Sequence, residues 1–398
     1  MLRHSKTLFS VSTFRPLSFL CLAVFGAGDA VGANWTVTPS LQLTVDYDDN
    51  VRLETVSPGS VVETTIIPEA SINRSTERSD VTIDATGSYA TFSGSGSQDL
   101  DGGDVILDLS AYRDNSERTR IGLDGEYIRD STLTSELETT GEVQERRRRD
   151  FAFIMPYWTY AISESSSIKF GYEYTDVSYD NPTSLNLFDY DLNALSATLT
   201  RQASEETEFF GTLEGARLEA PDKPEKNDYG SLELGVTRRF SPTLSGFVAV
   251  GGLSGDADVA SNGVRMSKDI SEGLFRAGIN RKIPVGELSA EIGRYVEPSG
   301  RGLLRRTDRI RVRLKRRLSP TTTFTLTAVI LEGQDVVGTD RIEREFYSIK
   351  PKISWLVTPT WSLEGAYRYR DQNSPENADS NTVGIGVVYV WPRITASP

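Results

Sequence analysis

The stretch Leu-Gln-Leu-Thr-Val-Asp-Tyr-Asp, residues 41–48, places an apolar side chain at every second position. The apolar set is Leu41, Leu43, Val45 and Tyr47, and the polar set between them is Gln42, Thr44, Asp46 and Asp48. A period of two is typical of a β-strand with one apolar face. The alternation returns at 120–127 and 168–175 and persists along the chain. The sequence therefore predicts a series of amphipathic strands.

The first 33 residues have the form of an export signal. Three basic residues precede an apolar run at 17–27, and small residues stand just before Asn34. This order of segments is typical of a signal peptide. We therefore expect residues 1–33 to be removed and the mature protein to begin near Asn34.

Removal of this segment would take away the only cysteine, Cys21, and the only histidine, His4. A chain without these residue types has no Ser-His-Asp or Cys-His nucleophile, no ordinary zinc site and no disulfide. We therefore expect neither an enzyme nor a cofactor or metal site. The absence of these residue types does not exclude an active site built from carboxylates or lysine alone, but no motif in the sequence resembles one.

The composition argues against insertion into a membrane as helices. The 398 residues carry a net charge of -13 and are 38% hydrophobic. After the signal, no apolar stretch approaches the roughly 20 residues that a spanning helix needs. The alternatives are a soluble exported protein such as a β-sandwich and a barrel that crosses the membrane with strands. Sustained alternation over the whole length favours the barrel.

Short and long connections alternate between the predicted strands. The short ones lie at 76–79, 114–117, 162–165, 203–206, 241–243, 284–286, 319–321 and 358–360. A Ser-Pro-Thr or Thr-Pro-Thr phrase closes the segments 238–243, 316–321 and 355–360, which indicates a hairpin repeat. The long polar segments are 93–103, 131–145, 181–187, 220–227, 256–267 and 371–380.

Bacterial outer-membrane barrels have short periplasmic turns and longer outer loops. We therefore predict an all-β, transmembrane, antiparallel up-and-down β-barrel of about 18 strands (roughly 16–18), with both chain ends on the periplasmic side. The barrel would span residues 34–391, and residues 392–398 would form a short C-terminal tail. The expected location is the outer membrane of a Gram-negative bacterium, with outer-membrane lipid around the barrel.

Aromatic residues gather where the short turns are expected. The tryptophans are Trp35, Trp158, Trp355, Trp361 and Trp391, and each lies near a chain end or a short turn. Tryptophan prefers the membrane–water interface, so these residues are expected to form one aromatic girdle. In the last strand, Gly386, Tyr389 and Trp391 resemble the C-terminal signal that the barrel assembly machinery reads. Here that signal would lie slightly inside the C-terminus, because seven residues follow Trp391.

Two segments near the start of the mature chain resemble a known family. They are Val-Asp-Tyr-Asp-Asp-Asn-Val at 45–51 and Ile-Pro-Glu-Ala-Ser-Ile at 67–72. Together they resemble the outer-membrane β-barrel porin family associated with exopolysaccharide gene clusters. The resemblance implies an exit channel for a secreted polysaccharide. It also implies periplasmic partners, namely polysaccharide export or co-polymerase proteins; nucleic acid is not an expected partner.

Placing the polar face inward divides the lumen into two walls. The expected acidic wall is Asp46, Asp84, Asp108, Asp124, Glu126, Glu173, Glu214 and Glu233. The expected basic track is Arg276, Arg309, Arg311, Arg313, Lys315, Arg344, Lys350, Lys352 and Arg368, with Arg317 and Arg370 nearby. Such walls would set up an electric field across the pore, which is one way in which channels select charged solutes.

The basic track allows two interpretations. Arginine holds carboxylates in paired hydrogen bonds, so the track could guide an anionic polysaccharide. Alternatively, Glu287, Glu291 and Glu364 on neighbouring strands pair with these cations and only stiffen the wall.

Three functional classes are therefore expected. The first, which the resemblance implies, is an export channel for a secreted exopolysaccharide, and the basic track leads us to expect an anionic one. The second is a general or solute-selective diffusion porin, which would carry a long constricting loop, whereas the longest connection here, 131–145, is modest. The third is a structural or adhesive barrel with a filled lumen.

Overall fold

The computed structural model describes residues 33–133, 135, 146–180, 187–221, 226–261, 264–336, 344–373 and 377–396. The expected signal peptide lies outside this part of the chain, apart from Ala33. The strands are β1 (Asn34–Asp48), β2 (Val61–Ser75), β3 (Ser79–Gly94), β4 (Gly102–Ser116), β5 (Thr119–Ser131), β6 (Arg148–Ser163), β7 (Ser166–Tyr179), β8 (Tyr190–Ser204), β9 (Thr207–Glu219), β10 (Lys226–Ser241), β11 (Leu244–Ser261), β12 (Val264–Ile283), β13 (Gly286–Pro298), β14 (Leu304–Arg317), β15 (Thr322–Asp335), β16 (Arg344–Leu356), β17 (Trp361–Asn373), β18 (Asn377–Val390) and β19 (Ile394–Ala396).

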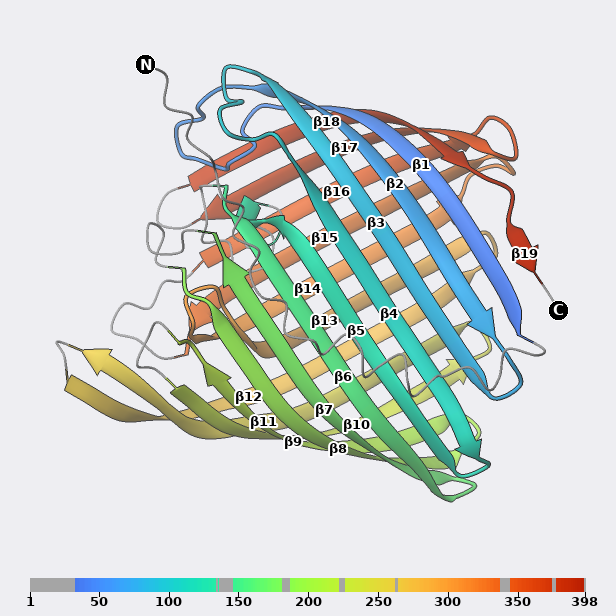
Figure 1. Ribbon diagram of the computed structural model, residues 1–398, viewed down its shortest axis with the longest axis vertical. Helices are drawn as coiled ribbons and strands as arrows, with labels where there is room; N and C mark the ends of the chain where they lie inside the picture. Colours follow the sequence, from blue (N-terminus) through green and yellow to red (C-terminus); the bar gives the residue numbers. More distant parts are fainter. Residues whose placement is uncertain are drawn as a thin grey trace, which may run out of the picture.

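Each strand from β1 to β18 pairs with its neighbours in the sequence, and β18 returns to pair with β1 (Figure 1). All the pairings are antiparallel, and Leu41 lies opposite Tyr389 where the ring closes. The predicted closed, all-β barrel of 18 strands is confirmed. β19 continues beyond β18 along the first residues of β1, with Trp35 opposite Ala396. The segment expected as a tail, 392–398, therefore contains a short strand that extends the seam.

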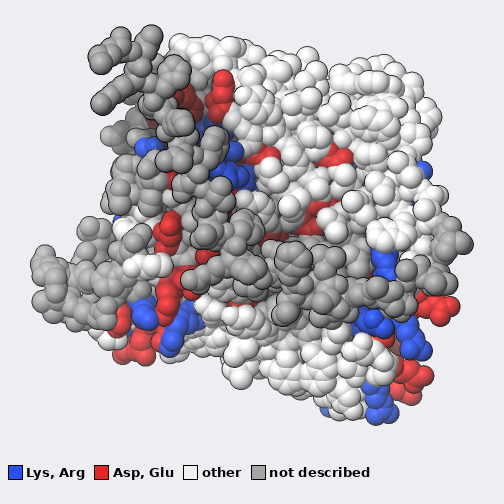
Figure 2. Space-filling view, viewed as in Figure 1, with Lys and Arg blue, Asp and Glu red and all other residues white. Residues whose placement is uncertain are grey.

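The alternation read from the sequence separates the two faces of the wall. Leu43, Val45 and Ile385 point outward and are among the exposed large hydrophobic residues. Their neighbours Thr44 and Asp46 line a cavity inside the barrel. In the view of Figure 2, most of the described surface belongs to residues other than Lys, Arg, Asp and Glu, and the charged residues are densest toward the two ends. An outward apolar band over a polar interior is the surface that lipid covers in transmembrane barrels.

One end of the barrel carries the short connections, which we call the turn end, and the other is the loop end. The eight predicted short turns all join consecutive strands within one or two residues of their expected positions. The repeated phrase has a local cause. The Ser319 hydroxyl accepts hydrogen bonds from the backbone N–H groups of Thr321 (3.2 Å) and Thr322 (3.0 Å). Thr358 accepts in the same way from Thr360 (3.3 Å) and Trp361 (3.0 Å), so the phrase encodes a Ser/Thr turn.

The prediction of a loop at 256–267 is wrong, because most of this segment lies in strands. β11 runs to Ser261 and β12 begins at Val264, and their pairing continues from Leu244 opposite Arg281 out to Ser261 opposite Val264. The Asp, Ser, Asn and Gly residues of this segment signalled a loop, but a ladder that is already formed gains hydrogen bonds with every further pair. The described residues contain no helix that is long and apolar enough to span a membrane.

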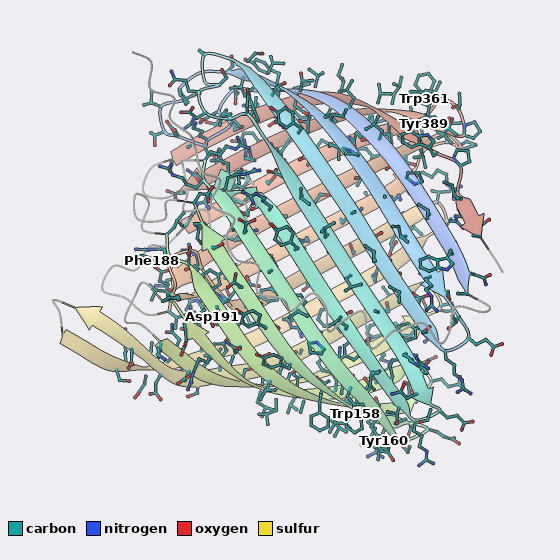
Figure 3. The ribbon with its side chains drawn as sticks, in the orientation of Figure 1. Trp158, Tyr160, Phe188, Asp191, Trp361 and Tyr389 are labelled. Atoms are coloured by element: carbon teal, nitrogen blue, oxygen red, sulfur yellow. The ribbon has the colours of Figure 1, made fainter. Side chains whose placement is uncertain are left out.

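All five tryptophans lie at or near the turn end, with side chains at least 39% exposed. The rings of Trp361 and Tyr389 are tilted to one another with 4.7 Å between their centroids, and those of Trp158 and Tyr160 are stacked with 5.8 Å between theirs. Figure 3 shows both pairs near the same end of the barrel, opposite the end where Phe188 and Asp191 lie. Their role at a membrane interface stays a prediction, as does the assembly role of Gly386, Tyr389 and Trp391.

Candidate functional site in the barrel lumen

Strand β14 supplies the longest row of basic side chains in the described lumen. Its outward face carries Ile310, so the alternate residues Arg309, Arg311, Arg313, Lys315 and Arg317 point inward. Arg309 pairs with Glu297 at 3.2 Å. Within the described residues, Arg311, Arg313 and Lys315 have no ion-pair or hydrogen-bond partner, and all three are exposed. We call these three residues the β14 cations.

The acidic neighbours that could neutralise the β14 cations are close but are not bonded to them. Glu291 lies directly opposite Arg311 in the pairing of β13 with β14, and Glu287 lies opposite Lys315. Glu291 instead accepts a hydrogen bond from the hydroxyl of Tyr295. Exposed and unpaired cations on an inward face need water around them, because burying an unpaired charge is costly. The lumen beside β14 is therefore hydrated.

Other members of the basic track are held by the wall. Lys352 donates to Glu364 at 3.0 Å, which is the pairing that a stiffened wall requires. Arg344 is buried and donates to Gln372, while Arg368 lies 3.9 Å from Asp48. Lys350 lines a cavity of about 320 Å³ together with the nearby acidic residues of β1 and β2. The pairing interpretation therefore holds for Lys352, whereas the β14 cations have no such partner in the described lumen and guidance of an anion stays a prediction for them.

Arg276 joins the acidic and basic walls. Its guanidinium donates two hydrogen bonds to the carboxylate of Glu233, one of them 2.9 Å long. Glu233 is on β10 and Arg276 on β12, so the pair reaches across β11. It can do so because the facing positions on β11 are Ala249, with only a methyl group, and Gly251, with no side chain, which leaves the space open.

The acidic residues form a row across β3, β4 and β5. Asp84 lies opposite Asp108, and Asp108 lies opposite Glu126, so all three side chains share the inward face. They line one cavity of about 280 Å³, to which Asp124 also belongs. Asp124 accepts a hydrogen bond of 3.0 Å from Ser110. In the described part of the chain, none of these four carboxylates forms an ion pair. We call Asp84, Asp108 and Glu126 the facing carboxylates.

The remaining acidic residues extend this wall. Glu173 and Glu214 point inward from β7 and β9, and Glu173 accepts a hydrogen bond of 3.2 Å from Thr175. Asp46, on β1, lies beside Gly384 of β18: a Cβ atom at Gly384 would come within 1.9 Å of the Asp46 carboxylate. The missing side chain at Gly384 therefore makes room for Asp46 where the ring closes.

The two unpaired sets lie on opposite sides of the lumen. β5 and β14 are nine strands apart in a ring of eighteen, which is half of the circumference. Figure 1 shows β5 on the near wall and β14 on the far wall. The facing carboxylates and the β14 cations therefore set up a transverse field across a hydrated channel.

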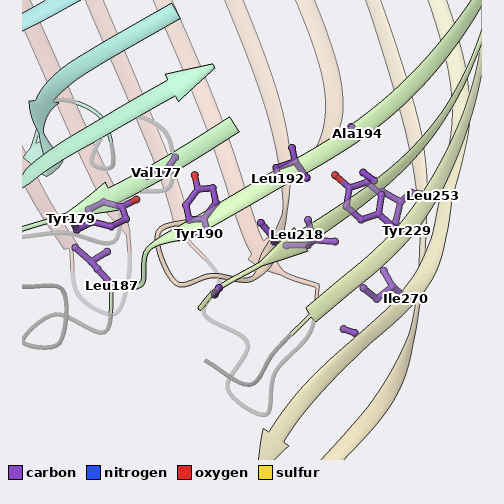
Figure 4. Close-up of a cluster of buried hydrophobic side chains, with 14 residues drawn as sticks. Val177, Tyr179, Leu187, Tyr190, Leu192, Ala194, Leu218, Tyr229, Leu253 and Ile270 are labelled. Atoms are coloured by element: carbon purple, nitrogen blue, oxygen red, sulfur yellow. The ribbon is translucent and has the colours of Figure 1, made fainter. Parts of the chain in front are cut away.

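The loop end is narrowed by an apolar cluster that the sequence did not indicate. We call it the mouth cluster; its buried members are Val177, Tyr179, Leu187, Tyr190, Leu192, Ala194, Ala216, Leu218, Ala220, Tyr229, Leu253, Ala257, Ile270 and Leu304 (Figure 4). Gly300, between β13 and β14, has no room for a side chain beside Tyr179 and Leu187. The N–H of Phe188 donates to the carbonyl of Gly300 at 2.8 Å. The β7–β8 and β13–β14 connections thus meet inside the mouth.

A second connection enters the mouth from the other side. Leu53, between β1 and β2, is fully buried with Leu331, Phe346 and Ala378. The Gln372 amide donates to the carbonyl of Leu53 at 2.7 Å and holds the connection in place. Shorter connections therefore enter the mouth from two sides, whereas a diffusion porin was expected to carry one long constricting loop. The segment 131–145 falls largely outside the described residues.

Comparison with known proteins gives likenesses in structure only. No protein-family model matches the chain, and no curated protein matches it. A BenF-like porin from Pseudomonas fluorescens Pf-5 is 12% identical, with 92% of this chain and 99% of that chain covered and a TM-score of 0.49. Acinetobacter baumannii OccAB4 is 11% identical, with 92% of this chain and 99% of that chain covered and a TM-score of 0.48. Pseudomonas aeruginosa OccK2 (OpdF) in complex with glucuronate is 10% identical, with 89% of this chain and 97% of that chain covered and a TM-score of 0.48. The chain is thus similar to porin channels in its barrel, and no link to exopolysaccharide gene clusters is shown.

Proposed function

We propose that this chain is an outer-membrane diffusion channel, selective for small charged solutes, and that the transverse field across its lumen provides the selectivity. One observation carries the proposal: the β14 cations are unpaired and exposed, and they face unpaired carboxylates across the ring. Fixed charges that line a channel attract counter-ions and repel ions of the same sign. A field across the path also favours solutes that carry both charges or a large dipole.

The narrowed mouth supports passage of small solutes over export of a polymer. Buried apolar side chains and one backbone hydrogen bond hold the β7–β8 and β13–β14 connections together at the loop end, and a separate cluster holds the β1–β2 connection against β15, β16 and β18. A polysaccharide chain in transit would have to displace these connections for the whole time of its passage. Export, the role that the family resemblance implies, is therefore the less favoured function. The expected barrel assembly machinery and periplasmic partners stay predictions.

The test is the ion selectivity of the purified, refolded barrel in planar bilayers, measured as the reversal potential in a KCl gradient. The variant is Arg311→Ser, Arg313→Ser and Lys315→Ser combined. Arg316→Ser is the matched control, because Arg316 is on the same strand and points outward. One unit charge close to an ion in water contributes about 1 kcal/mol, or roughly a fivefold change in relative permeability. We expect the triple variant to shift toward cation selectivity by at least this factor and the control to behave as wild type.

Two outcomes would contradict the proposal. A folded barrel without measurable conductance would indicate a filled, structural lumen. A strong block of the current by a long acidic polysaccharide added from the turn side, lost in the triple variant, would return export to first place.

A further inference from the structure

At the turn end of β4 to β7, two rows of lumen side chains lie side by side. Strand pairing places Tyr112, Gly122, Tyr157 and Gly171 in one row, in which tyrosine and glycine alternate. The next row toward the turns is Asp114, Arg120, Thr159 and Lys169. The second row thus brings two cations beneath two aromatic rings.

Glycine at position 122 lets the ring of Tyr157 lie against the wall. A Cβ atom at Gly122 would lie 2.1 Å from Cζ of Tyr157, so no other residue fits beneath the ring as it stands. The Nζ atom of Lys169 lies 4.0 Å from the centroid of that ring. A cation at this distance is attracted to the ring face, so the ring helps to position the lysine.

The two cations differ in their partners. Arg120 lies 4.0 Å from the ring centroid of Tyr112 and donates two hydrogen bonds to Asp114, of 2.7 and 3.0 Å. Its charge is therefore compensated. Lys169 has no carboxylate partner within the described residues, and the hydroxyl of Tyr157 forms no hydrogen bond there. A positioned ammonium group and a phenol donor thus remain available.

These groups line a cavity of about 550 Å³. Arg78 and Arg118, from two neighbouring turns, also line it, and neither has an ion-pair partner in the part of the chain that the structure describes. Its lining carries four cations (Arg78, Arg118, Arg120 and Lys169) against two carboxylates (Asp114 and Glu117), so the excess is two positive charges. A phosphate monoester carries about −1.5 to −2 charges at pH 7.

We propose that this cavity is a binding site for a small phosphate monoester on the turn side of the channel, with Lys169 as the principal ligand and Gly122 as a positioning residue. The site rests on the proposed function in one respect: the solute reaches it through the lumen. It lies apart from the β14 cations and has a different task. The transverse field selects solutes by charge, whereas the cavity retains one class of anion at the turn end of the channel.

Binding can be measured without any channel activity, by saturation-transfer NMR on the refolded barrel in detergent micelles. The probes are glycerol 3-phosphate, gluconate as a carboxylate of similar size, and uncharged glycerol. The variants are Lys169→Gln and Gly122→Ala. Lys282→Gln is the control, because its side chain faces the lumen near the turn end of β12, away from the cavity.

We expect glycerol 3-phosphate to bind and its affinity to fall about tenfold in Lys169→Gln, as for the loss of one charge-assisted bond. Gly122→Ala should weaken binding as well, because Tyr157 must move, while Lys282→Gln should bind as wild type. The inference is overturned if glycerol 3-phosphate does not bind, if Lys169→Gln and Lys282→Gln weaken it equally, or if gluconate binds as tightly. A barrel that binds the phosphate but does not conduct would refute the proposed channel and leave the site in place.

Discussion

At the scale of single residues, the ring closure depends on one buried carboxylate. Asp48, at the end of β1, is 4% exposed. It accepts hydrogen bonds from Arg370 (3.0 Å), Ser380 (2.8 Å) and Thr382 (2.7 Å), all from strands at the other end of the chain. A buried charge is tolerated when its bonds are satisfied in this way.

Asp48→Ala should lower the free energy of unfolding by about 3–5 kcal/mol, because it leaves the Arg370 guanidinium without its buried carboxylate. The measurement is urea unfolding in lipid vesicles, followed by tryptophan fluorescence. Asp84→Ala is the control, since the Asp84 carboxylate has no ion pair in the described lumen. Equal losses in the two variants would contradict a special role for Asp48.

The buried side chain of Leu53 anchors the connection between β1 and β2 inside the mouth. The backbone of Leu53 has a positive φ of 51°, an unusual conformation for a residue with a branched side chain. The fully buried side chain holds this conformation in place. Leu53→Ala should release the connection and produce a larger, noisier single-channel conductance, because a buried Leu→Ala change costs about 3–5 kcal/mol of packing. Val56→Ala, in the same connection but 82% exposed, should leave the conductance unchanged.

At the scale of elements, one seam in the wall is only partly hydrogen-bonded. The pairing of β12 with β13 reaches Phe275 opposite Arg294, although β12 continues to Val264 and β13 to Pro298. Between that pair and the loop end, side chains link β12 to β14. Arg306 of β14 lies 3.7 Å from Glu272 of β12, and Ile270 of β12 belongs to the mouth cluster together with Leu304 of β14.

Hydrogen exchange should detect this difference. Amide protons in 295–297 should exchange faster than those in 286–294, because the first group lacks β12 as a pairing partner in the described structure. Glu272→Gln should speed exchange in 295–297 further and leave β4 and β5 unchanged. Uniform protection along the whole of β13 would show that the seam is closed by backbone bonds after all.

At the scale of the whole molecule, selectivity depends on charges that are far apart in the sequence and opposed across the lumen. Neither wall alone makes a transverse field. The field exists because ring closure places β5 opposite β14. The pairing of Glu233 with Arg276 marks one edge of the acidic wall, and the cavity shared by Asp46 and Lys350 marks the other.

This arrangement predicts that the ion selectivity of the channel depends on the salt concentration. The Debye length falls from about 10 Å at 0.1 M to about 3 Å at 1 M, which is short compared with the width of a large barrel. Ion selectivity should therefore approach that of free solution at 1 M KCl and grow on dilution to 0.1 M. Reversal potentials at fixed gradient ratios would measure it. Selectivity that does not change with salt would indicate a narrow steric filter in place of the field.

The strands, their turns and the direction of most side chains can be predicted from the sequence, because the direction of a side chain in a strand is a local property with a period of two. The inward placement of Asp84 and Arg311 follows from their immediate neighbours alone. Which charges are paired depends on the folded barrel. Arg276 meets Glu233 across a third strand, and Arg311 remains unpaired although Glu291 lies opposite. The narrowing of the mouth depends on the folded barrel as well, because Leu53 and Leu187 acquire their buried neighbours only when the ring closes and distant connections meet.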